Sequence, residues 1–317
     1  MIQYRQLGKS DLQIAPLIFG GNVFGWTVDE NKSFELLDVF SAGGFNCVDT
    51  ADSYSRWVPG NKGGESETII GKWMKQKGNR EKIIISTKVG SDMGQGRKDV
   101  SKKYILNAVE DSLTRLQTNY IDLYQTHWDN EATPVEETLE AYDMLVKQGK
   151  VKWIGASNLS PERLAASLAA SKKHNYPVYQ TLQPEYNLYD REKFEKDYQP
   201  ICEQHNLSVI NYYALASGFL SGKYRSEADL GKSKRGGGVK KYLNERGFRI
   251  LSALNKVAAS HHTTRASVAI AWLIKQPIVA APIASATSIE QLNALMAAAT
   301  LQISSEALTE LNESSAW

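Results

Sequence analysis

The feature that most constrains the fold is a regular alternation of short apolar segments with amphipathic helical patterns. The apolar segments have the length of buried strands, and between them apolar residues recur at helical spacing. The predicted strands span residues 17–21, 45–49, 82–88, 121–127, 152–157, 178–183, 208–212 and 278–282. Strands that alternate with helices favour parallel pairing, with each helix crossing back over the sheet.

Eight such units predict a (β/α)8 TIM barrel that forms a single domain over residues 1–317. Polar and apolar residues alternate around Leu7–Ser10, which predicts an N-terminal β-hairpin before the barrel. Further helical patterns near the end of the chain predict extra C-terminal helices. A doubly wound open sheet is the alternative, but no Gly-x-Gly-x-x-Gly sequence follows the first strand.

Composition excludes several classes of function. The net charge of +2 gives no bulk basic surface for nucleic acid or an anionic membrane. Neither a signal peptide nor a segment of about 20 apolar residues is present. Cys47 and Cys202 lie far apart and lack metal-ligand spacing, so we expect neither a disulfide framework nor a metal site. These features predict a soluble, reduced, cytoplasmic protein, and they leave the oligomeric state open.

Three neighbouring strands end in groups that can exchange protons. Asp49 closes the second strand and Tyr54 lies five residues on, Lys88 ends the third strand, and His127 ends the fourth. Each residue alone has a structural explanation: an Asp in a turn, a half-buried Tyr ring, a surface Lys or a core His. The carboxyl ends of barrel strands meet at one mouth, however, so together the four predict a catalytic site there.

The chemistry of these groups is consistent with carbonyl reduction. A phenol has a pKa near ~10, and the cation of Lys88 should lower the pKa of Tyr54. Asp49 can hold Lys88, and His127 can donate a hydrogen bond to the same substrate oxygen. The set contains no nucleophile, metal cluster or Walker-type phosphate loop. A hydride from a nicotinamide is therefore the expected attacking group.

The chain resembles the aldo-keto reductases from Tyr4 to at least Gln291. The matching motifs are Tyr4–Ser10, Asp49-Thr50-Ala51 with Tyr54, Ser86–Gly90, Ile121–Tyr124 with His127, Ile154–Asn158, Gln183 with Tyr186-Asn187, Leu215–Gly218 and Ser221–Tyr224. The resemblance implies an oxidoreductase that reduces an aldehyde or ketone to the alcohol. It also implies Tyr54 as the general acid, with Asp49, Lys88 and His127 as its partners, and NADPH bound in an extended form across the mouth.

The resemblance assigns cofactor-binding roles residue by residue. Polar contacts to the nicotinamide carboxamide are implied for Ser157, Asn158 and Gln183. Tyr212 is implied as the aromatic that stacks on the nicotinamide ring. Contacts to the phosphates are implied for Leu215, Ser217 and Lys223. Tyr212 could instead be a plain core residue. The glycine-rich basic segment 232–241 could fold over the dinucleotide or remain a solvated loop.

The adenosine end departs from the common family pattern. Many relatives carry Lys or Arg after the eighth strand, whereas this chain offers Ser285 and Gln291. Gln291 also fits a capping box with Ser288, which is a structural role. Hydroxyl and amide groups can bind a phosphate without a cation. We therefore expect NADPH as the cofactor, with NADH possible.

The substrate pocket is expected to include Trp26, Trp57 and Trp128, with residues 55–64 forming one wall. The tail after Leu311 is short, so we expect no C-terminal loop of the kind that grips bulky substrates such as steroids. Small aldehydes or ketones and carbonyls derived from sugars or metabolites are the predicted substrates.

Two other functions are compatible with the sequence. Channel-associated β subunits share this fold and these four residues, so the chain could be a cofactor-sensing regulatory subunit. The absence of the long N-terminal extension that some of them carry favours the enzyme. A phosphate-binding isomerase on the same barrel is also possible, although the tyrosine–lysine pair would then have no role.

Overall fold

The computed structural model describes residues 2–317 and contains an eight-stranded parallel sheet that curls into a barrel. The strand order is β10-β3-β4-β5-β6-β7-β8-β9, so consecutive strands are neighbours. The strands are β3 (Ile18–Gly20), β4 (Cys47–Asp49), β5 (Ile84–Val89), β6 (Ile121–Thr126), β7 (Val151–Ser157), β8 (Thr181–Gln183), β9 (Ser208–Val209) and β10 (Ile283–Ala284). This topology confirms the predicted (β/α)8 barrel.

The eighth strand lies later in the chain than predicted. β10 pairs with β3, whereas residues 278–280 contact β9. The amide of Val209 donates to the carbonyl of Ile278 at 3.1 Å, and the amide of Ala280 donates to the carbonyl of Val209 at 2.9 Å. Pro282 lacks an amide proton, but its carbonyl accepts from the amide of Ile18 at 3.0 Å, and the amide of Ile283 donates to the carbonyl of Asn211 at 2.9 Å. The segment 278–284 thus closes the ring: residues 278–280 bond to β9, and residues 282–284 pair with β3, while Ile283 also bonds to Asn211 just after β9.

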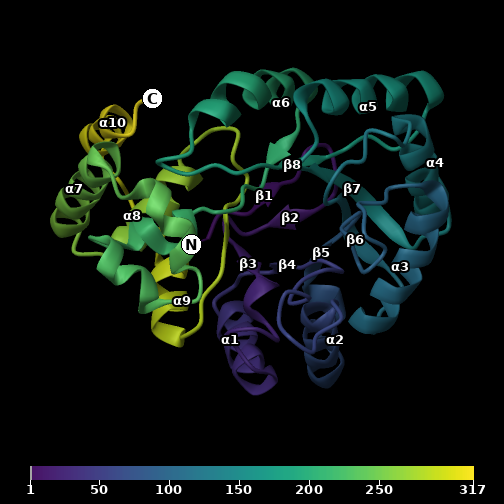
Figure 1. Cartoon of the computed structure of the whole chain (residues 1–317), viewed down its shortest axis with the longest axis horizontal. Coiled ribbons are helices and arrows are strands. Elements are labelled where there is room, and N and C mark those ends of the chain that lie inside the picture. The colour runs from purple at the N-terminus through teal and green to yellow at the C-terminus, as the bar shows by residue number, and fades with distance from the viewer. Residues whose placement is uncertain (1) are drawn as a thin grey trace.

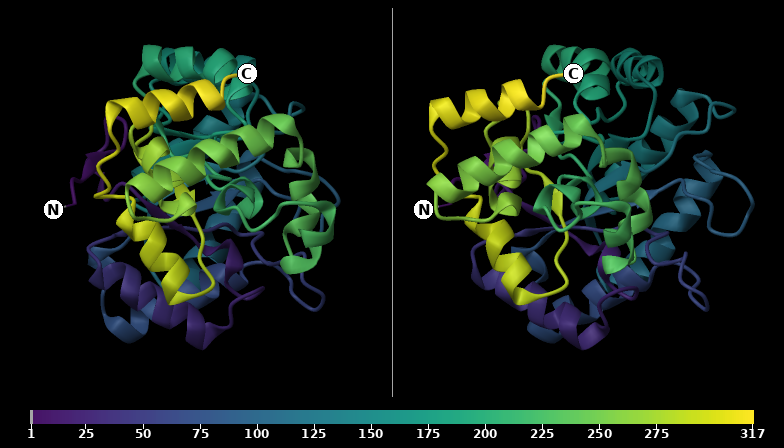
Figure 2. Two further views of the ribbon diagram at one scale, coloured as in Figure 1. Left: turned by 90° about the vertical axis from the view of Figure 1, so that its left-hand side faces the viewer. Right: turned by 60° about the vertical axis from the view of Figure 1, so that its left-hand side comes forward.

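Helices surround the sheet in Figure 1. They are α1 (Glu30–Ala42), α2 (Glu65–Lys77), α3 (Lys102–Leu116), α4 (Val135–Lys147), α5 (Pro161–His174), α6 (Gln199–His205), α7 (Glu245–Ser260), α8 (Arg265–Ile274), α9 (Ile289–Ala297) and α10 (Ser305–Ser314). The extra helices α7 and α10 lie side by side on the outside of the barrel (Figure 2). No helix of the part described has both the length and the apolar character needed to cross a bilayer.

Side-chain caps fix several helix starts. Ser101 and Ser160 accept hydrogen bonds from backbone amides of α3 and α5, as their positions in the sequence suggest. The sequence Thr133-Pro134-Val135-Glu136 has the form of a capping box at the start of α4, but the structure does not form one. Pro134, rather than Thr133, occupies the N-cap of α4 and offers no side-chain acceptor.

The N-terminal hairpin covers the amino-terminal end of the barrel. It pairs β1 (Arg5–Gln6) with β2 (Gln13–Ile14) and crosses the centre of the view in Figure 1. Its apolar side chains pack on the barrel interior in a cluster that includes Leu7, Leu12, Ile14, Ile18, Cys47, Leu123 and Ile210. The guanidinium of Arg5 donates to the carbonyls of Val279 and Ile274, both at 2.8 Å. The hairpin therefore seals one end, and ligands must enter from the carboxyl ends of the strands.

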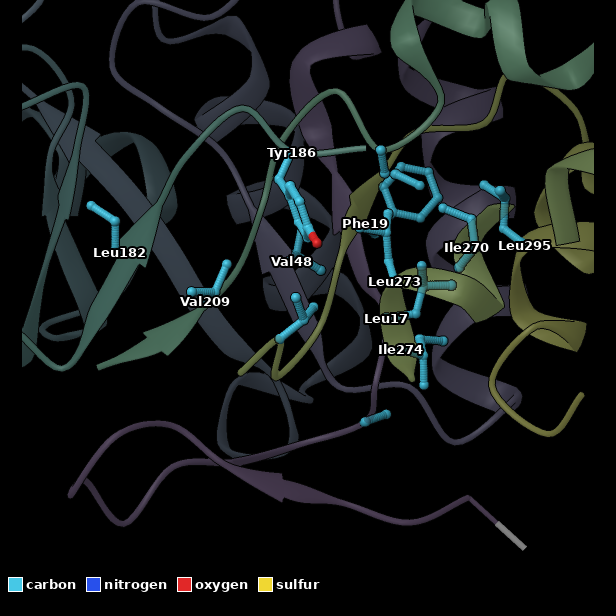
Figure 3. Packing of buried hydrophobic residues seen from close by; sticks show 14 of the residues in the cluster. Leu17, Phe19, Val48, Leu182, Tyr186, Val209, Ile270, Leu273, Ile274 and Leu295 are labelled. Atoms are coloured by element: carbon cyan, nitrogen blue, oxygen red, sulfur yellow. The ribbon is translucent and has the colours of Figure 1, made fainter. Parts of the chain in front are cut away.

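The main core lies between the sheet and the helices. In Figure 3, Leu17 and Phe19 on the β3 side face Ile270, Leu273 and Ile274 of α8. Each of these side chains is buried, and such burial stabilises the fold by about 1.5–3 kcal/mol per large residue. This packing holds the ends of the strands, and therefore the mouth, in a fixed geometry.

Candidate active site

The register of the sheet brings the predicted strand-end residues onto one inward face. Asp49 is the last residue of β4 and lies opposite Ser86 of β5, while Lys88 lies opposite Gln125 of β6. Tyr54 lies in the turn after β4, where its amide donates to the carbonyl of Ala51 at 3.3 Å. Successive side chains of a strand point to opposite faces of the sheet, so every second residue of these neighbouring strands points into the barrel interior.

Asp49, Lys88 and Tyr54 form one hydrogen-bonded group. The Lys88 ammonium lies 2.6 Å from Asp49 Oδ2 and 2.8 Å from the Tyr54 hydroxyl, and it also donates to the carbonyl of Thr50 at 2.7 Å. The Tyr54 hydroxyl lies 3.4 Å from Asp49 Oδ2. Lys88 and Asp49 are buried, with side-chain exposures of 0% and 1%. A buried lysine is therefore shared between a carboxylate and a phenol.

Three further side chains hold the second oxygen of Asp49. Ser86 donates to Oδ1 at 2.9 Å, Gln183 at 3.0 Å and Gln125 at 3.3 Å. Ser86 and Gln125 were not among the predicted site residues. Their position opposite Asp49 and Lys88 in neighbouring strands was the available signal, but it becomes readable only once the register is known. The three donors fix the carboxylate so that its other oxygen faces Lys88.

The electrostatics of Tyr54 differ from the expectation. Burial raises the pKa of the Tyr54 phenol well above its usual value, and the nearby carboxylate of Asp49 raises it further. Burial also lowers the pKa of Lys88, while Asp49 opposes that shift. The prediction that the lysine would lower the pKa of Tyr54 is therefore wrong for this state of the protein. Tyr54 is a neutral phenol at neutral pH that keeps its proton.

His127 follows β6 and lies beside Tyr54. The centroids of the two rings are 5.9 Å apart in an edge-on arrangement. Burial lowers the pKa of His127 well below its usual value, and the cations of Lys88 and Lys98 lower it further. The imidazole is therefore neutral at neutral pH and has one nitrogen that donates and one that accepts.

The three predicted pocket tryptophans gather around these two rings. Trp57 lies 6.2 Å from the Tyr54 ring and 5.5 Å from the Trp26 ring, both edge-on, measured between centroids. Trp128 stacks on His127 with centroids 5.9 Å apart and an interplanar angle of 28°. Trp57 and Trp128 are 51% and 37% exposed. The rim next to Tyr54 is thus aromatic and open to solvent.

The residues assigned to the nicotinamide end form a connected network. Ser157 donates to the carbonyl of Gln183 at 2.8 Å and accepts a hydrogen bond from the Asn158 amide at 3.0 Å. Asn158 also donates to the carbonyl of His127 at 2.9 Å, and its oxygen accepts from the Tyr212 hydroxyl at 3.0 Å. The half-buried Tyr212 is therefore tied to the strand ends on its polar side and is not a plain core residue.

The chain turns sharply after β9, where the phosphate contacts were predicted. Ala216, Ser217 and Gly218 have φ of 49°, 56° and 93°, which lie in the left-handed region that residues other than glycine rarely adopt. A Cβ on Gly218 would lie 3.3 Å from the Lys223 ammonium, so this amine packs over the turn. Successive turns of this kind form concave backbone surfaces that favour anions. Leu215 precedes the turn as its N-cap.

The basic segment 232–241 is folded and reaches across the mouth. It belongs to the 3₁₀ helices η5 (Glu227–Lys232) and η6 (Gly236–Tyr242) and the link between them. Lys241 forms ion pairs of 3.2 Å with Glu185 and Asp190 after β8. The segment is thus ordered by short 3₁₀ turns and by these ion pairs, while most of its side chains stay exposed.

Arg235, in the link between η5 and η6, was not predicted as a site residue. Its guanidinium donates to Asn22 Oδ1 at 3.2 Å and lies 5.5 Å above the Trp26 ring. The Ser285 hydroxyl donates to the same oxygen of Asn22 at 2.7 Å. Burial lowers the pKa of Arg235, and the nearby phenols of Tyr213, Tyr54 and Tyr224 oppose this shift. The basic segment thus brings a cation to the ends of β3 and β10.

Gln291 lies at the start of α9. Ser288 caps α9 by accepting from the amide of Gln291, as the capping-box reading expects. The Gln291 side chain, however, accepts from the amide and hydroxyl of Thr287 at 3.0 and 3.2 Å instead of bonding to Ser288. No three His, Cys, Asp or Glu side chains among residues 2–317 are grouped closely enough to hold a metal ion.

Comparison with known proteins agrees with this geometry. Residues 16–316 match the sequence profile of the Aldo/keto reductase family. A protein of Bacillus subtilis (strain 168) named Uncharacterized oxidoreductase YrpG is 33% identical over 98% of this chain and 95% of its own length. Aldo-keto reductase YhdN of the same organism is 33% identical over 81% of this chain and 75% of its own length. A probable voltage-gated potassium channel subunit beta of Arabidopsis thaliana is 31% identical over 94% of this chain and 91% of its own length. The chain therefore belongs to the aldo/keto reductase family of oxidoreductases.

Proposed function

We propose that this protein is an NADPH-dependent reductase that converts a small aldehyde or ketone to the alcohol, with Tyr54 as the general acid. One observation carries the proposal. The Tyr54 hydroxyl lies 2.8 Å from a fully buried lysine, which is itself paired with Asp49 at 2.6 Å. Family membership and the position of this group at the barrel mouth support it.

The high pKa of Tyr54 fits a general acid. The neutral phenol holds its proton until negative charge develops on the substrate oxygen, and the proton then moves from the Tyr54 oxygen to that oxygen. The Lys88 ammonium stabilises the phenolate left behind, and Asp49 keeps the ammonium in place. His127, as a neutral imidazole, donates a hydrogen bond to the same substrate oxygen.

The residues around the mouth fit a nicotinamide dinucleotide. When bound, the reduced nicotinamide supplies the hydride. Tyr212 offers an aromatic face, and the side-chain amides of Asn158 and Gln183 offer hydrogen bonds to a carboxamide. The left-handed turn at Ala216–Gly218 and the amine of Lys223 fit a pyrophosphate.

The preference for NADPH rests on Arg235. The segment after β10 carries Ser285 and Gln291 but no cation. Arg235 reaches the Asn22 oxygen that Ser285 also contacts, so it adds a positive charge on that side of the mouth. A 2′-phosphate is a negatively charged group that NADPH carries and NADH lacks, and comparison of the dissociation constants of NADPH and NADH tests this preference directly.

The aromatic rim favours small carbonyl compounds. Trp26, Trp57 and Trp128 surround Tyr54 and His127 and present apolar ring surface. We propose small aldehydes and ketones, including those derived from sugars or metabolites, as substrates. Steady-state rates on a panel of carbonyl compounds measure this, and a clear preference for steroids would contradict it.

The decisive variant is Tyr54→Phe, which removes the transferable proton and keeps the ring. We expect kcat to fall by about 10²–10⁴-fold, the usual contribution of a positioned acid. The dissociation constant for NADPH, followed by fluorescence titration, should stay unchanged. Retention of most of the turnover in Tyr54→Phe would show that another group supplies the proton.

The similarity to a plant potassium channel β subunit gives a second candidate, a regulatory subunit that senses the cofactor. This function predicts tight NADPH binding, negligible turnover on every carbonyl tested and recovery of a membrane protein in a pull-down. Measurable turnover that depends on Tyr54 favours the enzyme.

A further inference from the structure

Ser91 makes a contact that the proposed mechanism does not yet use. Its hydroxyl lies 2.9 Å from Nδ1 of His127 and accepts a hydrogen bond from the Ser53 hydroxyl at 3.1 Å. Ser91 is buried, with 6% of its surface exposed. Its backbone carbonyl accepts from the Gln95 side chain at 3.0 Å, which holds the residue in place. Ser53, Ser91 and His127 thus form a short chain of hydrogen bonds beside the mouth.

These hydrogen bonds join the loops that follow three neighbouring strands. Ser53 precedes Tyr54 in the turn after β4, Ser91 follows β5 three residues after Lys88, and His127 follows β6. The backbone segment that carries Tyr54 is therefore joined to the His127 ring through two serine hydroxyls, in addition to the contact between the two rings.

The hydrogen-bond donors and acceptors of Ser53 and Ser91 select one tautomer of the His127 imidazole. A serine hydroxyl has one proton to donate and two lone pairs. Ser53 donates to one lone pair of Ser91, and among residues 2–317 the acceptor within hydrogen-bonding distance of the Ser91 proton is Nδ1 of His127, so that proton is satisfied when it points at Nδ1. A neutral imidazole that accepts at Nδ1 must carry its own proton on Nε2.

We propose that Ser91, oriented by Ser53, is a positioning residue that fixes His127 in the tautomer with its proton on Nε2. This inference rests on the proposed function, because only this tautomer lets a neutral His127 donate from Nε2 to a substrate oxygen. Among residues 2–317, no side chain or backbone group is hydrogen-bonded to Nε2, which leaves this nitrogen for a ligand.

The direct test is a nitrogen NMR spectrum of the full chain labelled with ¹⁵N-histidine at neutral pH. The chain has five histidines, and the signals of His127 are those that disappear in His127→Gln. We expect a pyridine-type Nδ1 and a pyrrole-type Nε2. The reverse pattern, with the proton on Nδ1, would overturn the proposal, and so would a doubly protonated ring. The wild-type spectrum needs no serine variant and no turnover.

Kinetics of serine variants give a second test. Ser91→Ala removes the donor, and we expect kcat to fall about tenfold, which corresponds to about 1.4 kcal/mol. The KM and the dissociation constant for NADPH should change little. Ser91→Thr retains a hydroxyl and should restore most of the rate. Ser53→Ala keeps the Ser91 hydroxyl but removes the hydrogen bond that orients it. We therefore expect a mixture of His127 tautomers and a smaller loss of kcat than in Ser91→Ala.

The two tests separate failure of this inference from failure of the proposed function. If His127 is protonated on Nε2 in the wild type and becomes a mixture of tautomers in Ser53→Ala, the positioning role of Ser91 is supported even if no carbonyl is turned over. Turnover that depends on Tyr54, with the proton of His127 on Nδ1, supports the reductase and overturns the positioning role of Ser91. An unchanged kcat and unchanged His127 signals in Ser91→Ala would also overturn it.

Discussion

Asp52 is a buried carboxyl group that should make the stability of this protein depend on pH. It is 2% exposed, and neither of its carboxyl oxygens has a hydrogen-bond partner in the part of the chain described. Burial raises the pKa of Asp52 to about 8 from 3.8, and the carboxylate of Glu67 raises it further. The cations of Arg115 and Lys88 oppose the shift without cancelling it. The side chain is therefore mainly a neutral acid at neutral pH.

The sign and size of the effect follow from proton linkage. The folded chain binds a proton at Asp52 that the unfolded chain releases above pH 3.8, so the free energy of unfolding falls as pH rises towards about 8. One pH unit corresponds to about 1.4 kcal/mol. Between about pH 5 and pH 7, the wild type should lose about 2–3 kcal/mol through this group alone. Asp52→Asn cannot ionise and should not show this loss.

The assay is urea unfolding of both proteins at about pH 5, 6, 7 and 9, with fluorescence and circular dichroism recorded together to test two-state behaviour. The informative quantity is the difference between the two free energies of unfolding, because the other carboxylates contribute equally to both. Asp111→Asn, which removes an exposed carboxylate on α3, is the matched control and should follow the wild type. A difference between Asp52→Asn and wild type that stays constant from about pH 5 to pH 9 would refute a raised pKa for Asp52.

Two further substitutions test the packing around the site. Asp49→Asn leaves the buried Lys88 ammonium without its carboxylate and should lower the free energy of unfolding by about 3–5 kcal/mol, measured by urea unfolding. Asp143→Asn breaks the pair with Lys147, whose side chain is 74% exposed, and should cost less than about 1 kcal/mol; equal losses in the two variants would contradict the buried-pair argument. Gly71→Ala would place a Cβ 2.3 Å from the Arg115 carbonyl and should cost about 1–3 kcal/mol by thermal melting, although alanine normally favours a helix. Gly237→Ala, where a Cβ meets nothing within 4 Å, is its control, and an unchanged melting temperature in Gly71→Ala would contradict the close approach of α2 and α3.

Much of the fold could be predicted from local patterns. Apolar runs of strand length separated by helical periodicity gave the order of the strands and their parallel pairing. The eighth strand was misplaced because the apolar run at residues 278–282 looks like a continuous strand. In the structure residues 278–280 bond to β9, and the contact with β3 begins only at the carbonyl of Pro282. Hydrogen-bond partners across a closing barrel are not encoded in the run itself.

The candidate site was predictable to the extent that it depends on strand ends. Asp49, Tyr54, Lys88 and His127 could be named because the carboxyl ends of parallel strands meet at one mouth. The pKa of Tyr54 could not, since its direction depends on how deeply the phenol is buried and on the distance to Asp49. Arg235 was missed because it lies in a basic, glycine-rich segment that resembles a solvated loop. Its contact with Asn22 joins segments more than two hundred residues apart.

The sequence by itself determined the barrel, the family resemblance and the set of strand-end groups that can exchange protons, because these depend on periodicity and on short motifs. The tertiary structure alone decided which groups are desolvated and which hydroxyl faces which nitrogen. It buries Asp52 without a partner, and it brings Ser53 and Ser91 to His127. Desolvation and hydrogen bonding act over a few ångströms in space, and the residues that meet at those distances come from loops that the chain separates by dozens of positions.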